Sequence, residues 1–362
     1  DIYLQTWRFD VKSKPVKYLQ RGISKLSKLR RSQGATRPVN LWLLINVTKL
    51  QNRTKEKKKI KNFIKKNSSK YVRIHYTLFT AKKLGANHAK SVSVDNTIAL
   101  VTGANMSHNN DGLGFYDSGF IVKGQIVSSI TKDFVKIWHS WSPKGAPKPK
   151  VTKALPSYNC LPILFATTKA VNQFRAPIQN SSLNNAVLRL IRNSRKSISI
   201  LTPNLNVELI IEELRAAVKR GVVVRIVLSK GFEELSENLF TRGGANYYSV
   251  KDLYWPLITH YKSRKNTCAK LQIKWYSNNG KKIVRGSKPP ASHAKYMVVD
   301  GQVTVIGSQN MDNQSWINSR EIGLIIDSAS RARSWQRQVF NPVFNKAIAV
   351  EQCGGPIDSR SR

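Results

Sequence analysis

The sequence contains one pattern twice. Residues 88–106 read HAKSVSVDNTIALVTGANM, and residues 293–311 read HAKYMVVDGQVTVIGSQNM. Aligned without a gap, the two stretches share seven of nineteen residues: His, Ala, Lys, Val, Asp, Asn and Met. A His followed by Lys at +2 and Asp at +7 should arise by chance in under about one per cent of cases, yet two of the six histidines begin one. We therefore expect two structurally similar units.

The segments around each copy match in order. Each half reads as a strand, an amphipathic helix and a buried strand. In the early half these are residues 1–10, 16–31 and 39–47, and in the late half residues 197–206, 207–221 and 222–231. The sequence therefore predicts an α/β fold of two similar β/α halves, with mixed, largely parallel sheets flanked by helices. The late half has a further helix at 183–197 that the early half lacks, so we expect Asp1 not to be the native N-terminus.

A linker is expected between the halves. Residues 142–156, SPKGAPKPKVTKALP, hold four prolines and one glycine and no apolar pattern of element length. The predicted domains are an N-terminal half at 1–141, the linker at 142–156 and a C-terminal half at 157–362.

The repeated residues indicate a site rather than a core. On a strand, positions i and i+2 project from one face, so His88 points with Lys90, and His293 with Lys295. The flanking residues are apolar and read as buried, and charges are rarely buried without a partner. Two such pairs facing each other across a pseudo-twofold axis would line one shared cleft with imidazole, ammonium and amide groups.

That set of groups suits a phosphodiester. Lysines and amides stabilise the charge on the non-bridging oxygens, one imidazole attacks phosphorus, and the other protonates the leaving alcohol. The motif contains no carboxylate cage and no metal-ligand spacing. We therefore expect neither a metal nor a cofactor.

The doubled His-x-Lys-x4-Asp motif with a trailing Gly-Ser-x-Asn resembles the phospholipase D superfamily, over both halves of the chain. The resemblance implies a covalent phosphohistidine intermediate, resolved by water or another alcohol, and an active monomer, since one chain carries both motifs. It assigns His88 as nucleophile and His293 as general acid and base. It implies that Lys90 and Lys295 contact the phosphoryl group. The further phosphate-binding residues are Asn105, Ser308 and Asn310, and Asp95 and Asp300 support the site.

Two further acids stand where family members carry a carboxylate that grips a histidine. These are Asp117, twelve residues past Asn105, and Glu321, eleven residues past Asn310. An ordinary carboxylate at a strand edge is the alternative for each. The early copy departs from the pattern, because Gly103 aligns with Ser308. Equal phosphate binding by the two halves is therefore not expected.

The net charge of the chain indicates what kind of molecule the protein binds. The chain has 61 Lys and Arg against 20 Asp and Glu, a net charge of +41, which attracts polyanions without identifying them. The favoured function is lipid-directed, a phospholipase D or phosphatidyltransferase acting at an anionic membrane surface. The alternative is a metal-independent endonuclease acting on DNA or RNA, and a basic binding protein without activity is the third interpretation. The basic helix expected at 53–66 suits either polyanion, and residues 250–262 predict either an interfacial loop or buried packing.

The cysteines and the apolar runs add little to the predicted fold and function. Cys160, Cys268 and Cys353 cannot all pair and form no ligand cluster, so neither a disulfide framework nor a zinc site is expected. No apolar run approaches the roughly 18 residues of a membrane span, so we expect no transmembrane segment.

Overall fold

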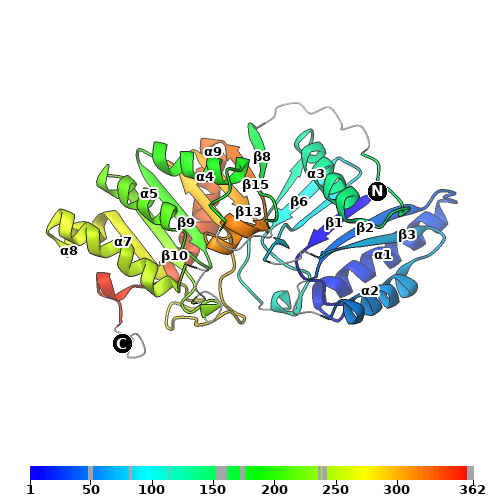
Figure 1. The fold of residues 1–362 in the computed structure, drawn as a ribbon, viewed down its shortest axis with the longest axis horizontal. Helices are drawn as coiled ribbons and strands as arrows, with labels where there is room; N and C mark the ends of the chain where they lie inside the picture. The colour runs from blue at the N-terminus through cyan, green and yellow to red at the C-terminus, as the bar shows by residue number, and fades with distance from the viewer. Residues whose placement is uncertain are drawn as a thin grey trace.

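The computed structural model describes residues 1–47, 52–80, 84–112, 114–151, 161–171, 176–234, 238 and 243–356. Its described residues form two large sheets, one in each half, that lie next to each other with helices packed on their faces, and a small two-stranded sheet with one strand from each half (Figure 1). The expected α/β fold of two similar halves is confirmed.

The N-terminal half forms a sheet of order β3-β2-β1-β5-β6-β7. Its strands are β1 (Ile2–Thr6), β2 (Val39–Asn46), β3 (Val72–Phe79), β5 (Ser91–Val94), β6 (Ile98–Thr102) and β7 (Gly119–Lys123), with the short β4 (Ala86–Asn87) outside it. Its helices are α1 (Lys14–Ser32), α2 (Arg53–Asn67), the 3-10 turn η1 (His108–Asn110) and α3 (Ile126–Trp141). Helices α1 and α2 cover one face of the sheet and α3 the other (Figure 1).

The C-terminal half forms a sheet of order β16-β11-β10-β9-β12-β13-β15-β8. Its strands are β8 (Ile163–Thr167), β9 (Ser197–Thr202), β10 (Val223–Leu228), β11 (Leu271–Trp275), β12 (Tyr296–Val299), β13 (Val303–Gly307), β15 (Ile322–Asp327) and β16 (Ile348–Ala349), and β14 (Ser319–Arg320) lies outside it. Its helices are α4 (Ser182–Asn193), α5 (Glu208–Lys219), α7 (Asn246–Tyr261), α8 (Arg264–Lys270), η2 (Gln314–Asn318), α9 (Ala329–Trp335), η3 (Gln336–Phe340), α10 (Asn341–Lys346) and η4 (Glu351–Cys353).

The sheet order shows which elements of the two halves correspond. Strands β1, β2 and β3 match β9, β10 and β11, and the motif hairpins β5–β6 and β12–β13 occupy the same places in their sheets. Parallel pairing is confined to the three matched strands of each sheet. The motif strands pair antiparallel, because each copy of the motif turns back on itself. The sheets are therefore mixed, with less parallel pairing than the sequence indicated.

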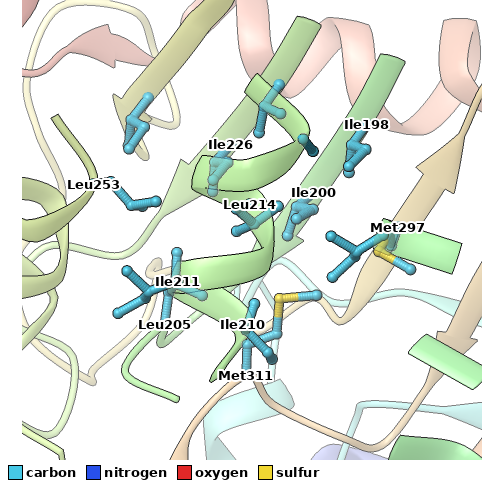
Figure 2. Close-up of a cluster of buried hydrophobic side chains, with 14 of the residues drawn as sticks. Ile198, Ile200, Leu205, Ile210, Ile211, Leu214, Ile226, Leu253, Met297 and Met311 are labelled. Carbon is cyan, nitrogen blue, oxygen red and sulfur yellow. The ribbon is translucent and has the colours of Figure 1, made fainter. Parts of the chain in front are cut away.

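The core of the C-terminal half shows why its sequence pattern reads so clearly. Side chains from strands β9, β10 and β12 meet side chains from α5 and α7 (Figure 2). Ile200, Ile210, Leu214, Ile226 and Leu253 are all fully buried there. Burial of one such side chain contributes about 1.5–3 kcal/mol, so this layer holds the helices against the sheet that carries the second motif.

The linker is not free of contacts where it is described. Tyr3 Oη donates a hydrogen bond to the Lys150 carbonyl (2.6 Å), and Trp138 Nε1 donates to the Pro147 carbonyl (3.1 Å). The segment at least up to residue 151 therefore packs along the N-terminal half. Residues 152–160 lie outside the described residues, so the domain bounds at 141 and 157 stay a proposal.

Three other expectations can be compared with the fold. Residues 250–262 belong mainly to helix α7, in which Tyr254 and Leu257 are buried while Trp255 is 73% exposed. Cys268 and Cys353 form a disulfide, which the sequence did not indicate because the two residues are 85 positions apart; Cys160 lies outside the described residues. No helix within the described part of the chain has the length and apolar content to cross a membrane.

Candidate active site

The two motif histidines lie just before the motif strands, not on them, and each is held by the opposite half. Strand β4 pairs in parallel with β14, and the backbone N–H of His88 donates to the Arg320 carbonyl (2.9 Å). Because Glu321 follows Arg320, this register places the Glu321 side chain next to His88. The two strands come from different halves, so the early histidine is fixed by the late half.

The second histidine repeats this arrangement in the opposite sense. Tyr116 and Ser292 form a parallel bridge, and the His293 N–H donates to the Tyr116 carbonyl (2.8 Å). Asp117, the next residue, is thereby brought to His293. The site thus consists of two short inter-half ladders, each placing an acid beside a histidine.

The histidine–acid pairs are consequently crossed between halves. His88 Nδ1 lies 2.9 Å from Glu321 Oε1, and His293 Nδ1 lies 2.8 Å from Asp117 Oδ2. A carboxylate at Nδ1 accepts the proton there and leaves the Nε2 lone pair free, so it fixes the tautomer of each ring. Both imidazoles are therefore oriented with Nε2 as the reactive nitrogen.

The two lysines occupy equivalent, buried positions. Lys90 Nζ donates to the His88 carbonyl (2.6 Å), and Lys295 Nζ donates to the His293 carbonyl (2.5 Å). Both lysines are at least 96% buried, with exposures of 1% and 4%. Each ammonium group thus contacts the backbone of its own motif histidine, and the two lysines directly precede β5 and β12.

Electrostatics tie the four groups into one site. Burial, followed by Lys295, lowers the pKa of His293 to about 3 against the opposing effect of Asp117. Burial also lowers the pKa of His88, more than Glu321 raises it, and Lys90 and Lys295 lower it further. Each histidine thus senses the lysines of both halves. Near neutral pH both imidazoles are uncharged, which is the form able to attack phosphorus.

The lysines and Glu321 are shifted as well. Burial lowers the pKa of Lys295 to about 8 and that of Lys90 well below its usual value, against the attraction of the nearby acids. For Glu321, burial favours the protonated form, but His88, Lys90 and Ser308 keep its pKa below the usual value. The site therefore combines an ionised acid with lysines whose positive charge an incoming anion would stabilise.

Ser308 lies behind Glu321 and not at the phosphate-binding position that the sequence predicted. Its side chain is fully buried, and Oγ donates to Glu321 Oε2 (2.5 Å) while accepting from the Ile322 N–H (3.1 Å). Strand β13 points this hydroxyl at the acid rather than at the cleft. We correct its expected phosphate-binding role: Ser308 orients the carboxylate that orients His88.

The missing serine in the early copy has a steric reason. A Cβ at Gly103 would lie 2.3 Å from Asp117 Oδ1 and 2.9 Å from Lys295 Cδ, so no side chain fits there. The Asp117 carboxylate accepts instead from the backbone N–H of Ser118 (2.9 Å). The shorter acid and the glycine are thus a matched set, as are Glu321 and Ser308.

The two asparagines are brought to the same region but differ in their partners. Asn310 Nδ2 donates to Asp312 Oδ2 (2.8 Å), an acid that also acts electrostatically on both lysines. The Oδ1 atoms of Asn105 and Asn310 are buried and have no hydrogen-bond partner among the described residues.

The motif aspartates are not brought to the site. Asp95 and Asp300 begin the hairpin turns with positive φ angles of 47° and 55°, a conformation that Asp tolerates better than most residues. Asp300 accepts from the backbone N–H groups of Arg195, Lys196 and Ser197, which fastens the hairpin to the start of β9. They support the sheet, at the far end of the motif strands from the histidines.

Several residues at the site escaped the sequence reasoning. Trp7 packs edge-on against His88 (5.4 Å between ring centroids), while Phe115 and Phe232 stack on His293 (5.2 and 5.8 Å). Trp7 and Phe232 follow β1 and β10, and sites in α/β sheets gather at the carboxyl ends of parallel strands, a signal that could have found them. The sequence contained no comparable signal for Arg320. Its guanidinium reaches Gln5, Asn87 and Asp133 of the other half.

The chain is similar in sequence to a known protein family and to curated proteins. The family model described as "Cardiolipin synthase, PLD-like domain" matches residues 187–342. Cardiolipin synthase 2 of Staphylococcus epidermidis is 22% identical over 307 residues, which cover 82% of this chain and 56% of the relative. Cardiolipin synthase A of Pseudomonas fluorescens is 24% identical over 250 residues, which cover 67% of this chain and 44% of the relative. The chain thus spans about half the length of the curated relatives it matches.

A solved structure shares the fold over nearly the whole chain. The crystal structure of phosphatidylserine synthase from Haemophilus influenzae matches 97% of this chain and 82% of its own, with a TM-score of 0.64 and 12% identity. At that identity the likeness concerns the fold alone. The family match within the C-terminal half and the cardiolipin synthase relatives support membership of the phospholipase D superfamily, and the solved structure shows that the fold is shared.

Proposed function

We propose that the protein is a phospholipase D-type enzyme that cleaves or transfers the phosphatidyl group of a phospholipid through a covalent phosphohistidine. The observation that carries this proposal is the crossed pair of histidine–acid contacts with two buried lysines between them. One histidine serves as nucleophile while the other is available for proton transfer. The proposed reaction uses no metal and no cofactor.

In the first step the phosphodiester occupies the space between the two Nε2 atoms. Nε2 of His88 attacks phosphorus, and the bond from phosphorus to the head-group oxygen breaks. His293 donates the proton from its Nε2 to that oxygen, so the head group leaves as an alcohol. Lys90, Lys295, Asn105 and Asn310 bear on the non-bridging oxygens, where negative charge increases in the transition state.

In the second step an acceptor hydroxyl takes the place of the head group. Neutral His293 accepts its proton, and the acceptor oxygen attacks phosphorus as the bond to His88 breaks. Water as acceptor gives phosphatidic acid, and another alcohol gives a new phospholipid. Glu321 and Asp117 keep the Nδ1 protons in place throughout.

His293 must carry a second proton for the first step. In the free protein its pKa is about 3, because burial and Lys295 disfavour the charge. A bound phosphodiester brings negative charge to the same place and raises that pKa. Substrate binding therefore has to be accompanied by proton uptake, which isothermal titration in buffers of different ionisation enthalpy measures.

The relatives, which are cardiolipin synthases, favour phospholipid as substrate. The net charge of +41 favours the second candidate, a metal-independent endonuclease acting on DNA or RNA. Both use the same chemistry at phosphorus, so the site geometry does not separate them. Products do. Release of a free head group, or formation of a new phospholipid, with EDTA present supports the lipid enzyme, whereas cleavage of DNA beside intact phospholipid supports the nuclease.

Trapping of the intermediate tests the mechanism. After turnover of a substrate labelled in its phosphate, a denaturing alkaline quench should leave label on the peptide that contains His88. His88→Asn should abolish the label. His293→Asn should retain it with a substrate whose leaving group departs without protonation.

The exposed His139 provides the matched control, because His139→Asn should change nothing. Label on the peptide that contains His293 would exchange the two roles. Activity that is lost in EDTA and restored by a divalent ion would contradict the proposal.

A further inference from the structure

The positive charge of the chain is distributed unequally between the two halves. Helices α1 and α2 together carry fifteen lysines and arginines and one acid. The helices in the corresponding places of the C-terminal half are α5, α7 and α8, which together carry six lysines and arginines and four acids. A general bias toward basic residues would act on both halves alike. Helices α1 and α2 therefore concentrate a net charge of +14 on one face of the N-terminal half, against +2 on the corresponding helices.

These two helices form one continuous surface. They lie next to each other on the same face of the sheet, where Ile23, Ile60 and Phe63 anchor them in a common core (Figure 1). All eight basic residues of α2 and six of the seven in α1 are exposed. Only α2 contains an acid, Glu56, and Lys59 already pairs with it (2.6 Å). We call this outward side of α1 and α2 the basic face.

The basic face also exposes apolar side chains. On α1, Tyr18 is 63% exposed and Leu29 is 53% exposed. They lie on one stripe of the helix with the exposed Arg21 and Lys25, since residues three and four positions apart are neighbours. The guanidinium of Arg21 lies 5.6 Å from the Tyr18 ring centroid. Aromatic and aliphatic side chains within a lysine-rich helix face are typical of helices that lie in a bilayer interface.

We propose that the basic face is a docking surface for an anionic lipid bilayer. The choice of a bilayer over a nucleic acid rests on the proposed lipid substrate and on the exposed Tyr18 and Leu29. Lysines and arginines near an anionic leaflet contribute within a Debye length of the surface. Docking by this face holds the enzyme at its substrate and leaves the chemistry at the histidines unchanged.

Charge reversal on α2 tests the proposal, with a matched reversal in the other half as control. The test variant is Lys57→Glu, Lys58→Glu and Lys61→Glu. The control is Lys219→Glu, Arg264→Glu and Lys265→Glu, at three exposed positions of α5 and α8. Both change the net charge equally. Binding is measured by co-sedimentation with vesicles of equal parts phosphatidylcholine and phosphatidylglycerol, and with duplex DNA.

We expect the test variant to bind these vesicles about a hundredfold more weakly, since each basic residue contributes about 1 kcal/mol at such a surface. The control variant should bind like the unchanged protein. Both variants should turn over a short, water-soluble phosphodiester at the rate of the unchanged protein. If the unchanged protein does not turn over this substrate, the proposed function is contradicted instead. A second reversal on α1, Lys17→Glu with Lys25→Glu and Lys28→Glu, should reproduce the effect if α2 tolerates its changes poorly.

A polar double variant separates lipid from nucleic acid. Tyr18→Ser with Leu29→Ser keeps the charge and removes the apolar stripe, so it should weaken vesicle binding and leave DNA binding unchanged. Equal losses in the test and control variants would show that only net charge matters and would overturn the proposal. A test variant that loses DNA binding while it keeps vesicle binding would assign the face to nucleic acid instead.

Discussion

At the scale of single residues, the two halves solve the same problem with different side chains. Glu321 reaches His88 with support from the Ser308 hydroxyl, whereas the shorter Asp117 reaches His293 with support from a backbone N–H. Gly103 leaves room for Asp117, so the departure of the early copy from the motif is a packing requirement. Each acid depends on its own surroundings: Glu321 on Ser308, and Asp117 on the space at Gly103.

Ser308→Ala tests the support of Glu321. The change removes one hydrogen bond to a buried, ionised carboxylate, an interaction worth about 1.5–3 kcal/mol. We expect a lower kcat with KM little changed, because the nucleophile is less well oriented while phosphate binding is intact. Steady-state kinetics measure this.

The matched control lies on β13, the strand that directly precedes Ser308. Thr304→Val removes a buried hydroxyl that has no hydrogen-bond partner among the described residues, so kcat should not change. Equal effects of the two substitutions would mean that Ser308 acts only through packing.

The shifted lysines predict the alkaline limb of the pH profile. Because the pKa of Lys295 is lowered to about 8, its charge is present below that pH and is lost as the pH rises through it. We expect kcat/KM for a soluble phosphodiester to fall above about pH 8, since the free enzyme must be charged there to bind the phosphate. The lowered pKa of Lys90 acts in the same direction.

The acidic limb has the opposite cause. The neutral imidazole of His88 is the attacking form, and its pKa is lowered by burial, so activity should persist below the ordinary histidine pKa of about 6.5.

For the alkaline limb, a pH profile of kcat/KM that stays flat up to about pH 10, where ordinary lysines titrate, would contradict the assignment to Lys295.

At the scale of elements, the short pairing of β4 with β14 connects the halves at the site. Arg320 of β14 is 2% exposed and donates to Gln5 (2.9 Å) and Asn87 (2.6 Å), and it pairs with Asp133 of α3. It precedes Glu321 in the chain. Its contacts therefore hold the strand that directly precedes Glu321, the partner of His88.

Arg320→Met should destabilise the protein by about 3–5 kcal/mol, because it leaves the largely buried Asp133 without its partner. It should also lower kcat, since β14 carries Glu321 into place. Chemical denaturation and steady-state kinetics give the two readouts, and Asp133→Asn in the same background should restore part of the stability.

Arg192→Met is the comparison. Arg192 pairs with Glu213 at 2.7 Å, but its side chain is 50% exposed, so the loss should stay below about 1 kcal/mol. Similar losses for both arginines would show that the inter-half contacts contribute little.

At the scale of the whole molecule, each half has a hydrophobic core of its own, a further apolar cluster contains residues of both halves, and the site forms where the halves meet. The Cys268–Cys353 disulfide lies within the C-terminal half and joins α8 to the turn η4 near the end of the described chain. It touches none of the site residues, so it concerns stability rather than chemistry.

Replacing both cysteines, Cys268→Ser with Cys353→Ser, should lower the free energy of unfolding by about 2–4 kcal/mol, because the unfolded chain regains the freedom of an 85-residue loop. Guanidinium unfolding with and without a reductant measures this. The unchanged protein should lose a similar amount in reductant, and the double variant nothing. Turnover below the unfolding midpoint should be unaffected in both.

The sequence alone predicted the two similar halves, the fold class and the His–Lys pairs, and the family resemblance added the two acids. Periodic apolar residues predict strands and helices locally, and an internal repeat shows itself without any structure. The repeated His and Lys stood out because charged groups on an otherwise apolar run need a reason to be there. These are properties of neighbouring residues along the chain.

Only the tertiary structure decided which acid serves which histidine. Glu321 lies 233 positions from His88 and Asp117 lies 176 positions from His293, and nothing local in the sequence encodes those pairings. They follow from the register of two short ladders between the halves. Within the C-terminal half, the pairing of β13 with β15 brings Ser308 to Glu321, and Asp95 and Asp300 lie in the turns of the motif hairpins. The sequence could name the groups, but their partners depend on how the two halves pack against each other.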